Sequence, residues 1–162
     1  MCGKKEIKLE TTIVHKTGNP ENGYTDEEQL LLDTLTHRDD VCECMKNIAS
    51  YIEDIGEWHD WSKIEYFDDF QKDCLERLTT PQFKEREWYH IHTCKERHHI
   101  NARTPSDVNF FDIIEMFVDC IVAGKTRTGK VNNSFLVLPQ SVINEAYWNT
   151  IKLLQEKIII EE

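Results

Sequence analysis

The sequence predicts an all-α fold with a short extended segment at the N-terminus. Helix-forming residue types dominate the 162-residue chain, whereas only 6 residues are glycine and 4 are proline. After residue 24, apolar residues recur at the three- and four-residue steps of amphipathic helices. We therefore expect residues 25–162 to form one helical domain and residues 1–24 to form an appendage.

The overall charge narrows the classes of partner. The formal net charge is −11, which disfavours binding to a nucleic-acid duplex or to a membrane surface. Two stretches, 90–103 and 120–144, are nevertheless locally basic, which suits them to attract a small anion. No apolar run approaches the ~18 residues of a membrane-spanning helix. Neither a signal peptide nor a paired cysteine motif is recognised, so we expect a cytoplasmic protein with free thiols, compatible with a homo-oligomer.

The N-terminal segment combines strand-like and turn-like sequence. Residues 7–14 show the partial alternation of a strand, and residues 18–23 are rich in Gly, Asn and Pro. We expect an extended appendage or a short hairpin here. Thr25 and Glu28 then form a capping-box pattern, which predicts a short helix ending near Thr36.

A longer amphipathic helix is predicted over residues 37–55. Its apolar positions are spaced by four, three, four and three residues: Val41, Met45, Ile48, Ile52 and Ile55. His37 lies four residues before Val41 and extends this face, where its ring nitrogens need partners. Taken alone, this helix favours a hydrogen-bonded core histidine over a metal ligand.

The next predicted helix begins with His59 and Asp60, after a C-cap at Gly56, and extends to about Leu78. Its expected apolar positions are Ile64, Phe67, Cys74, Leu75 and Leu78. Asp60 precedes Ile64 by four residues and should face inward, where an unpaired carboxylate is costly unless a metal or a salt bridge compensates it. The other aspartates of this helix are expected to face solvent: Asp68, Asp69 and Asp73.

A histidine-rich helix is predicted over residues 83–101. Four histidines fall within ten residues: His90, His92, His98 and His99. His92 and His99 are seven residues apart and would therefore share one face of a helix. An exposed run of histidines is the alternative, although soluble surfaces normally use Lys and Glu instead.

A helix capped by Ser106 or Asp107 is predicted over residues 108–123. Its expected apolar stripe is Phe111, Ile114, Val118 and Val122. A parallel stripe of carboxylates is of the kind that is usually solvated: Asp112, Glu115 and Asp119. Asp119 differs because apolar residues flank it, so we expect it at the edge of the core.

Residues 124–138 are expected to form a loop, and Pro139 to begin a terminal helix. Residues 124–131 nearly match a P-loop. However, Val131 stands where that motif needs a hydroxyl, and the stretch follows a helix rather than a strand, so we reject nucleotide binding of this kind. Lys125 and Arg127 remain candidates for a looser contact with phosphate.

The candidate ligands occur in a recognisable order: His37, the pair His59-Asp60, the histidine-rich segment and Asp119. This order resembles the H…HD…D signature of the HD-domain superfamily of metal-dependent phosphohydrolases, which are helical bundles. Lys63 matches the HDxxK pattern common in that family. More narrowly, the HDWSK motif and the Arg97-His98-His99 run resemble small HD-like proteins of bacteria and phages. The resemblance covers about residues 30–125.

The resemblance implies a ligand set for one divalent metal ion: His37, His59, Asp60 and Asp119. It also implies a second ion or a substrate contact at His92 and at His99 or His98, and a phosphate contact at Lys63. The ion would be Mn, Fe, Ni, Zn or Mg, with one or two bound. Asp60 would take part in catalysis, and Asp68 could aid water activation, although a plain surface carboxylate explains it more simply.

The expected function is hydrolysis of a phosphoester or phosphoanhydride, in a nucleotide or a related small phosphate. Lys63, Lys125 and Arg127 would position the anion. Two alternatives stay open: a di-iron HD-type oxygenase, because the extra histidines permit it, and a non-catalytic helical module that binds a nucleotide or a protein.

Overall fold

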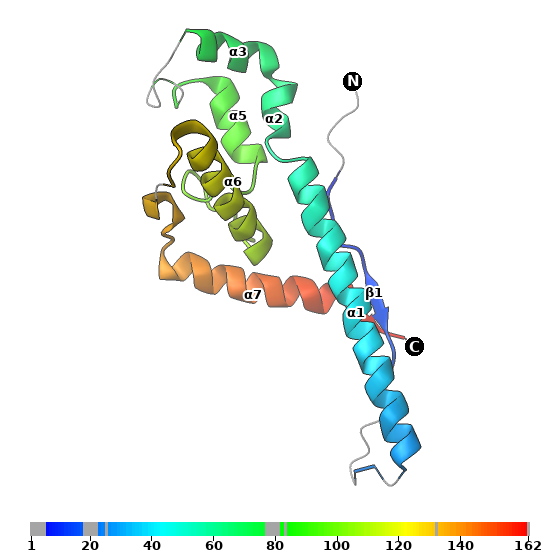
Figure 1. Ribbon diagram of the computed structural model, residues 1–162. Coiled ribbons are helices and arrows are strands. Elements are labelled where there is room, and N and C mark those ends of the chain that lie inside the picture. Colours follow the sequence, from blue (N-terminus) through cyan, green and yellow to red (C-terminus); the bar gives the residue numbers. More distant parts are fainter. Residues whose placement is uncertain are drawn as a thin grey trace. The chain divides into compact units, whose positions relative to one another are not determined.

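The computed structural model describes residues 6–17, 23–24, 26–76, 82, 84–131 and 133–161. Helices dominate and one small parallel sheet accompanies them (Figure 1), so the predicted all-α fold with a short N-terminal strand is confirmed. The chain forms two compact units. One is built from Ile55–Thr150, and the other from Lys5–Asp54 together with Ile151–Glu162.

Helix α1 spans Glu27–Glu57 and begins where the Asp26 carboxylate accepts the backbone N–H of Glu28 at 2.9 Å. The prediction of two helices that meet near Thr36 is wrong, because residues 27–55 contain neither Gly nor Pro to interrupt the helix. The predicted C-cap at Gly56 is also wrong, since α1 continues to Glu57. The predicted N-cap Thr25 lies outside the described residues.

The N-terminal strand pairs with the C-terminal end of the chain. Strand β1 (Thr12–Val14) and strand β2 (Ile158–Ile160) are parallel, and Thr12 lies opposite Ile158. The strand is tied to α1, because Asp40 accepts hydrogen bonds from the backbone N–H and the ring Nδ1 of His15 at 2.8 and 2.7 Å. The described part of this segment therefore forms a parallel sheet instead of the hairpin that we considered.

The helices of the unit formed by Ile55–Thr150 differ in length from the prediction. They are α2 (Trp61–Glu65), α3 (Phe67–Leu75), α5 (Glu87–Lys95), α6 (Phe110–Thr128), the 3-10 turn η1 (Asn133–Leu136) and the start of α7 (Gln140–Lys157). Helix α2 packs against both α3 and α5 (Figure 1). The helix predicted from residue 59 to 78 is broken at Tyr66, whose φ of −109° and ψ of 37° are not helical. The start of α7 directly after Pro139 confirms that prediction.

On α2, α3 and α6 the buried and exposed side chains differ from those predicted. On α6 the buried apolar side chains are Phe111, Ile113 and Met116, whereas most of the predicted stripe is exposed: Ile114, Val118 and Val122. On α2 and α3 several predicted core positions are likewise exposed: Ile64, Phe67, Cys74 and Leu75. Asp73, predicted to face solvent, is buried and accepts the indole N–H of Trp88 at 2.6 Å. Polar pairs thus occupy positions that periodicity alone assigned to the solvent side.

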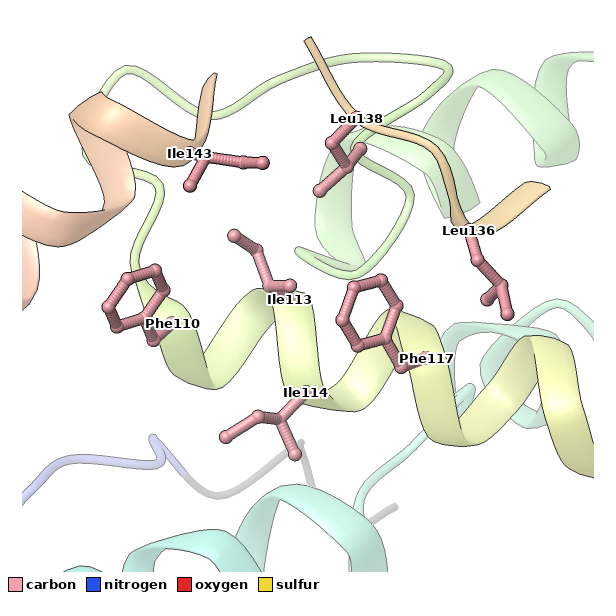
Figure 2. Close-up of a pocket in the computed structure, with 7 residues that line it drawn as sticks. All are labelled: Phe110, Ile113, Ile114, Phe117, Leu136, Leu138 and Ile143. Carbon is pink, nitrogen blue, oxygen red and sulfur yellow. The ribbon is translucent and has the colours of Figure 1, made fainter. Parts of the chain in front are cut away.

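The apolar core of this unit joins α6 and α7 to the segment between α5 and α6. Its buried members are Ile100, Val108, Ile113, Met116, Leu138, Val142 and Ala146. A pocket of about 340 Å³ borders the core between α6, the segment around η1 and the start of α7 (Figure 2). The described side chains that line it are all apolar, and the candidate ligands lie elsewhere.

Helix α6 continues into the predicted loop and ends at Thr128, with Gly129 in the left-handed conformation at φ 70°. The chain then turns back, and a Cβ atom on Gly124 would lie 2.7 Å from the carbonyl oxygen of Lys130. These two glycines, which produce the near match to a P-loop, therefore serve the close turn at the end of α6.

Among the described residues no helix is both long and apolar enough to cross a membrane. The described cysteines are free thiols: Cys42, Cys44, Cys74, Cys94 and Cys120.

Candidate metal centre

His59 and Asp60 lie in the turn that separates α1 from α2, not on a helix as predicted. Asp60 has a φ of 56°, a left-handed conformation that among the described residues only it and two glycines adopt. Aspartate tolerates this region better than most residue types because its short side chain can bond locally. The turn brings the His59 and Asp60 side chains within 3.4 Å of each other.

The carboxylate of Asp60 is the hub of the site. Its Oδ2 accepts a hydrogen bond from Lys63 Nζ and lies 3.4 Å from His59 Nε2. Its Oδ1 faces the Nε2 atoms of His92 and His98, each at 3.5 Å. Burial disfavours the charged form, but His98 and Lys63 outweigh it and hold the pKa of Asp60 below its usual range. Asp60 is therefore ionised.

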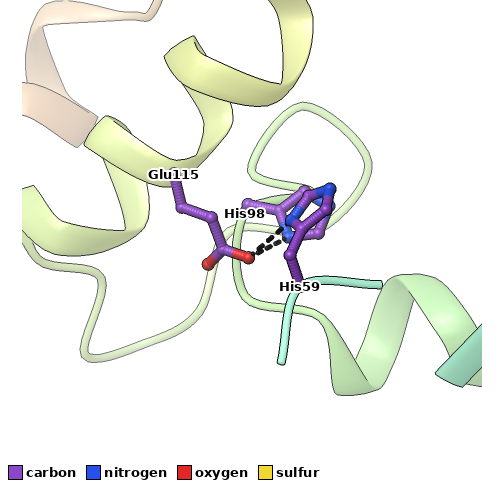
Figure 3. A group of neighbouring side chains, drawn as sticks. All are labelled: His59, His98 and Glu115. Carbon is purple, nitrogen blue, oxygen red and sulfur yellow. Dashed lines mark hydrogen bonds and ion pairs between the residues drawn. The ribbon is translucent and has the colours of Figure 1, made fainter. Parts of the chain in front are cut away.

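Glu115 on α6 connects His59 to His98 (Figure 3). Its Oε1 lies 2.9 Å from His59 Nδ1 and 2.8 Å from His98 Nδ1. Burial opposes ionisation, yet these two hydrogen bonds lower the pKa of Glu115 to about 2. An ionised carboxylate can only accept, so both Nδ1 atoms carry their proton and donate it to Glu115.

Asp119 lies one helical turn beyond Glu115 and approaches the opposite nitrogen of His59. Its Oδ1 is 3.6 Å from His59 Nε2. Asp119 and Glu115 together raise the pKa of His59 to about 10, so this imidazole is a cation at neutral pH. Asp60 and Asp119 thus converge on one nitrogen that holds a proton, which is an arrangement that also suits a divalent cation.

His92 and His99 form a second part of the cluster. Their Nε2 atoms are 2.6 Å apart, and Ser62 Oγ lies 2.6 Å from His92 Nδ1. Burial lowers the pKa of His92 to about 3 and, together with the charge of His98, that of His99 to about 4. Both rings are therefore neutral at pH 7 and able to ligate a metal.

The helix predicted over residues 83–101 corresponds to α5, which ends at Lys95. His98 and His99 therefore lie in the turns that follow the helix. The expectation that His92 and His99 share a helical face is therefore wrong. The two rings meet because the chain folds back after α5, which brings His99 onto His92.

Arg97 fixes this turn to the start of α6. Its guanidinium donates two hydrogen bonds of 2.7 and 2.9 Å to the Asp112 carboxylate. It donates two more to Asp107, one of 3.0 Å to the carboxylate and one of 3.2 Å to the backbone carbonyl. Asp112 also closes a capping box with Asn109, which is the N-cap of α6 in place of the predicted Ser106 or Asp107. Asp112, expected to be solvated, is buried and anchors the segment that carries His98.

Two buried atoms in the cluster lack a hydrogen-bond partner within the described parts of the chain, namely Asp60 Oδ1 and His98 Nε2. Leaving such groups unpaired costs about 1–3 kcal/mol each. They lie 3.5 Å apart, and two ligands of one tetrahedral ion at 2.0–2.2 Å are separated by about 3.3–3.6 Å. The residues present therefore fit a metal ion, with two overlapping donor groups: Asp60, His98 and His99, or His59, His98 and Glu115.

A family model matches residues 26–157 of the chain. The chain belongs to DUF5662, a family of unknown function. No curated protein and no solved structure matches it. The match to DUF5662 includes the whole candidate centre and leaves out the N-terminal strand, and it names no activity.

The structure of this DUF5662 member brings together most of the ligands proposed from sequence: His59, Asp60, Lys63, His92, His98, His99 and Asp119. Three others are exposed and lie outside the cluster: Asp68 on α3, and Lys125 and Arg127 in the last turns of α6. His37 is an exposed residue of α1 in the other unit, and its part in metal binding stays a prediction.

Sequence reasoning missed two residues of the centre. Glu115 binds two of the histidines, and Ser62 binds a third. The signal for Glu115 was its position four residues before Asp119 on one helix face, which we interpreted as solvated. No spacing rule identifies Ser62, whose backbone N–H also donates to Glu96 at 2.8 Å.

Proposed function

We propose that this protein is a metal-dependent phosphohydrolase that acts on a nucleotide or a related small phosphate ester or anhydride. The observation that carries the proposal is the unpaired, buried Asp60 Oδ1 and His98 Nε2, surrounded by further imidazole and carboxylate groups. Such a donor set of nitrogen and oxygen suits Mn, Fe, Ni or Zn, and less well Mg.

The residues divide into two halves that share Asp60. On its Oδ2 side, His59 Nε2 and Asp119 offer ligands, and on its Oδ1 side His92, His98 and His99 do so. One or two divalent ions are compatible with this set. A bound divalent ion supplies Lewis-acid chemistry, since it acidifies water and neutralises charge on phosphoryl oxygens.

The chain's own groups account for binding of the anion. Lys63 pairs with Asp60, and its side chain is still 24% exposed, so its ammonium group can turn towards a phosphate oxygen. Lys125 and Arg127 add positive charge at the exposed end of α6, which suits them to attract an anion more than to hold it. Asp68 is exposed on α3, which fits the plain surface carboxylate that explained it more simply than a role in water activation.

The abundance of histidine supports a second candidate function. Four imidazoles and three carboxylates also suit a pair of iron ions, so oxygen chemistry at a di-iron site is the alternative within the enzyme class. An iron content near two per chain together with O₂ consumption would favour it over hydrolysis. Tight binding of a nucleotide without turnover in any metal would instead favour a binding module.

The test compares His59→Ala with the matched control His90→Ala, which removes an exposed histidine of α5. We expect one or two first-row metal ions per chain in the wild type and in the control, measured by elemental analysis. In His59→Ala we expect metal affinity and phosphate release from nucleotides to fall about 100-fold or more. Full activity in His59→Ala, or in wild-type protein stripped of metal, would refute the proposal.

A further inference from the structure

The two donor groups of the centre compete for one histidine. His98 faces Glu115 with Nδ1 at 2.8 Å and Asp60 with Nε2 at 3.5 Å. It would therefore serve the group with His59 and Glu115 through Nδ1, and the group with Asp60 and His99 through Nε2. In a neutral imidazole, one ring nitrogen carries a proton and the other has the lone pair that can bind a metal. Only one of the two groups can therefore bind an ion at a time.

We infer that Glu115 is a positioning residue and not a metal ligand: it holds the Nδ1–H of both His59 and His98, and so presents both Nε2 atoms to Asp60 and the metal. This inference rests on the metal centre of the proposed function. It extends that function by naming which ring nitrogen of each histidine faces the ion and which residue makes the selection.

The distances around Glu115 support this role. One oxygen, Oε1, serves both rings at 2.9 and 2.8 Å, which are the lengths of charge-assisted hydrogen bonds. Two ligands of a common tetrahedral ion would stand about 3.3–3.6 Å apart. The separations on the other side of the rings are of this size, with 3.6 Å from His59 Nε2 to Asp119 and 3.5 Å from His98 Nε2 to Asp60.

The buried atoms without a hydrogen-bond partner also support a positioning role for Glu115. Both Nδ1 atoms already have an acceptor in Glu115, whereas His98 Nε2 and Asp60 Oδ1 have no hydrogen-bond partner in the described structure. The side chain of Glu115 is only 13% exposed, so water competes little for its oxygen. Metal-ligating histidines commonly donate their second N–H to a carboxylate, which fixes the ring and its tautomer.

Loss of Glu115 should release both rings. Without the acceptor, His59 and His98 can place their proton on Nε2 and donate it to Asp119 and Asp60, which closes the site to a cation. We therefore expect Glu115→Ala to bind Cd²⁺ about 10–100-fold more weakly than the wild type, with the number of ions per chain unchanged. In Glu115→Gln the amide oxygen can still accept from both rings, so part of the affinity should return.

The decisive experiment is long-range ¹H–¹⁵N correlation NMR of the full chain labelled with [¹⁵N]histidine and loaded with ¹¹³Cd²⁺. We expect His59 and His98 to show ¹¹³Cd coupling at Nε2 and a protonated Nδ1. Coupling at Nδ1 of either ring, or loss of the ion from a Glu115→Ala protein that still folds, would overturn the inference. Glu65→Gln is the control, since it removes a surface carboxylate whose partner in the described structure is Lys95, and its affinity should equal that of the wild type.

The outcomes also separate this inference from the proposed function. Cd²⁺ coupled to Nε2 in a protein that hydrolyses no phosphate refutes the hydrolase and supports the positioning role. Coupling to Nδ1 in an active hydrolase refutes the positioning role alone. A protein whose imidazoles bind no ion refutes both, and because the wild-type spectrum decides these cases, the result does not depend on whether Glu115→Ala folds.

Discussion

Asp60 combines a strained backbone with the most connected side chain of the centre. Its φ of 56° lies in a region that costs an ordinary L-residue about 1–2 kcal/mol, and aspartate somewhat less. That conformation separates α1 from α2 and aims the carboxylate at His59 on one side and at His92 and His98 on the other. At this residue the fold accepts local strain in order to place a functional group.

The backbone contribution can be measured apart from the carboxylate. Asp60→Gly and Asp60→Ala both remove the carboxylate, so both should lose metal binding. Glycine adopts the left-handed region without penalty, so the glycine variant should be more stable than the alanine variant by about 1 kcal/mol in urea unfolding. The same pair of substitutions at Glu145, an exposed position of α7, should show the opposite order by about 1 kcal/mol. Equal stabilities at position 60 would argue against the left-handed turn.

At the end of α6, two glycines have the spacing of a P-loop for a structural reason. Gly124 lies inside the helix, yet the carbonyl of Lys130 passes 2.7 Å from where its Cβ would be. Gly129 ends the helix in the left-handed conformation. The P-loop-like spacing of these glycines follows from the return of the chain over its own helix.

This geometry predicts an unusual response to alanine. An alanine in a helix is normally better than glycine by about 1 kcal/mol, but Gly124→Ala should destabilise the protein by about 1–3 kcal/mol because backbone has to move. Gly56→Ala in α1 is the matched control, since nothing lies within 4 Å of the new Cβ, and it should stabilise by about 1 kcal/mol. Urea unfolding of the two variants measures both effects, and a gain in stability at position 124 would contradict the close approach.

The elements themselves were only partly predictable. Periodicity and Pro139 located the long helices, but the breaks at Tyr66 and after Lys95 carry no Gly or Pro signal. The N-cap of α6 is Asn109 with Asp112 three residues on, whereas the sequence prediction placed the cap at Ser106 or Asp107 and Asp112 in a solvated stripe. Ion pairs with one buried partner, such as Asp112 with Arg97, depart from the usual assignment of charged residues to the surface.

At the scale of the whole molecule, the order of His59-Asp60 and Asp119 in the chain correctly predicted that distant segments meet. The contact of His92 with His99 was predicted for a wrong reason, because it depends on how the turn after α5 folds back. The role of Glu115 depends on which face of α6 is buried, and hydrophobic periodicity placed that face incorrectly. The part of His37, which belongs to the other unit, stays a prediction.

Proton release should accompany metal binding by the whole protein. In the metal-free state the raised pKa of His59, about 10, adds stability below pH 6.5 that is lost as the pH rises towards 10. A metal at Nε2 must displace that proton, whereas His92 and His99, with pKa values of about 3 and 4, are already neutral. The affinity should therefore rise about tenfold per pH unit for each proton released, between pH 6.5 and 8.5.

Calorimetric titration with Zn²⁺ in two non-coordinating buffers of different ionisation enthalpy counts these protons directly. We expect at least one proton released per chain, and a second if His98, whose pKa is also raised, binds as a neutral ligand. The gain in thermal stability at a fixed excess of Zn²⁺ should grow over the same pH range, because tighter binding to the folded state stabilises it further. His90→Ala should behave like the wild type. An affinity that does not change with pH would mean that the ion binds away from His59. The charged His59 imidazole between Asp60 and Asp119 would then contribute to stability and not to metal binding.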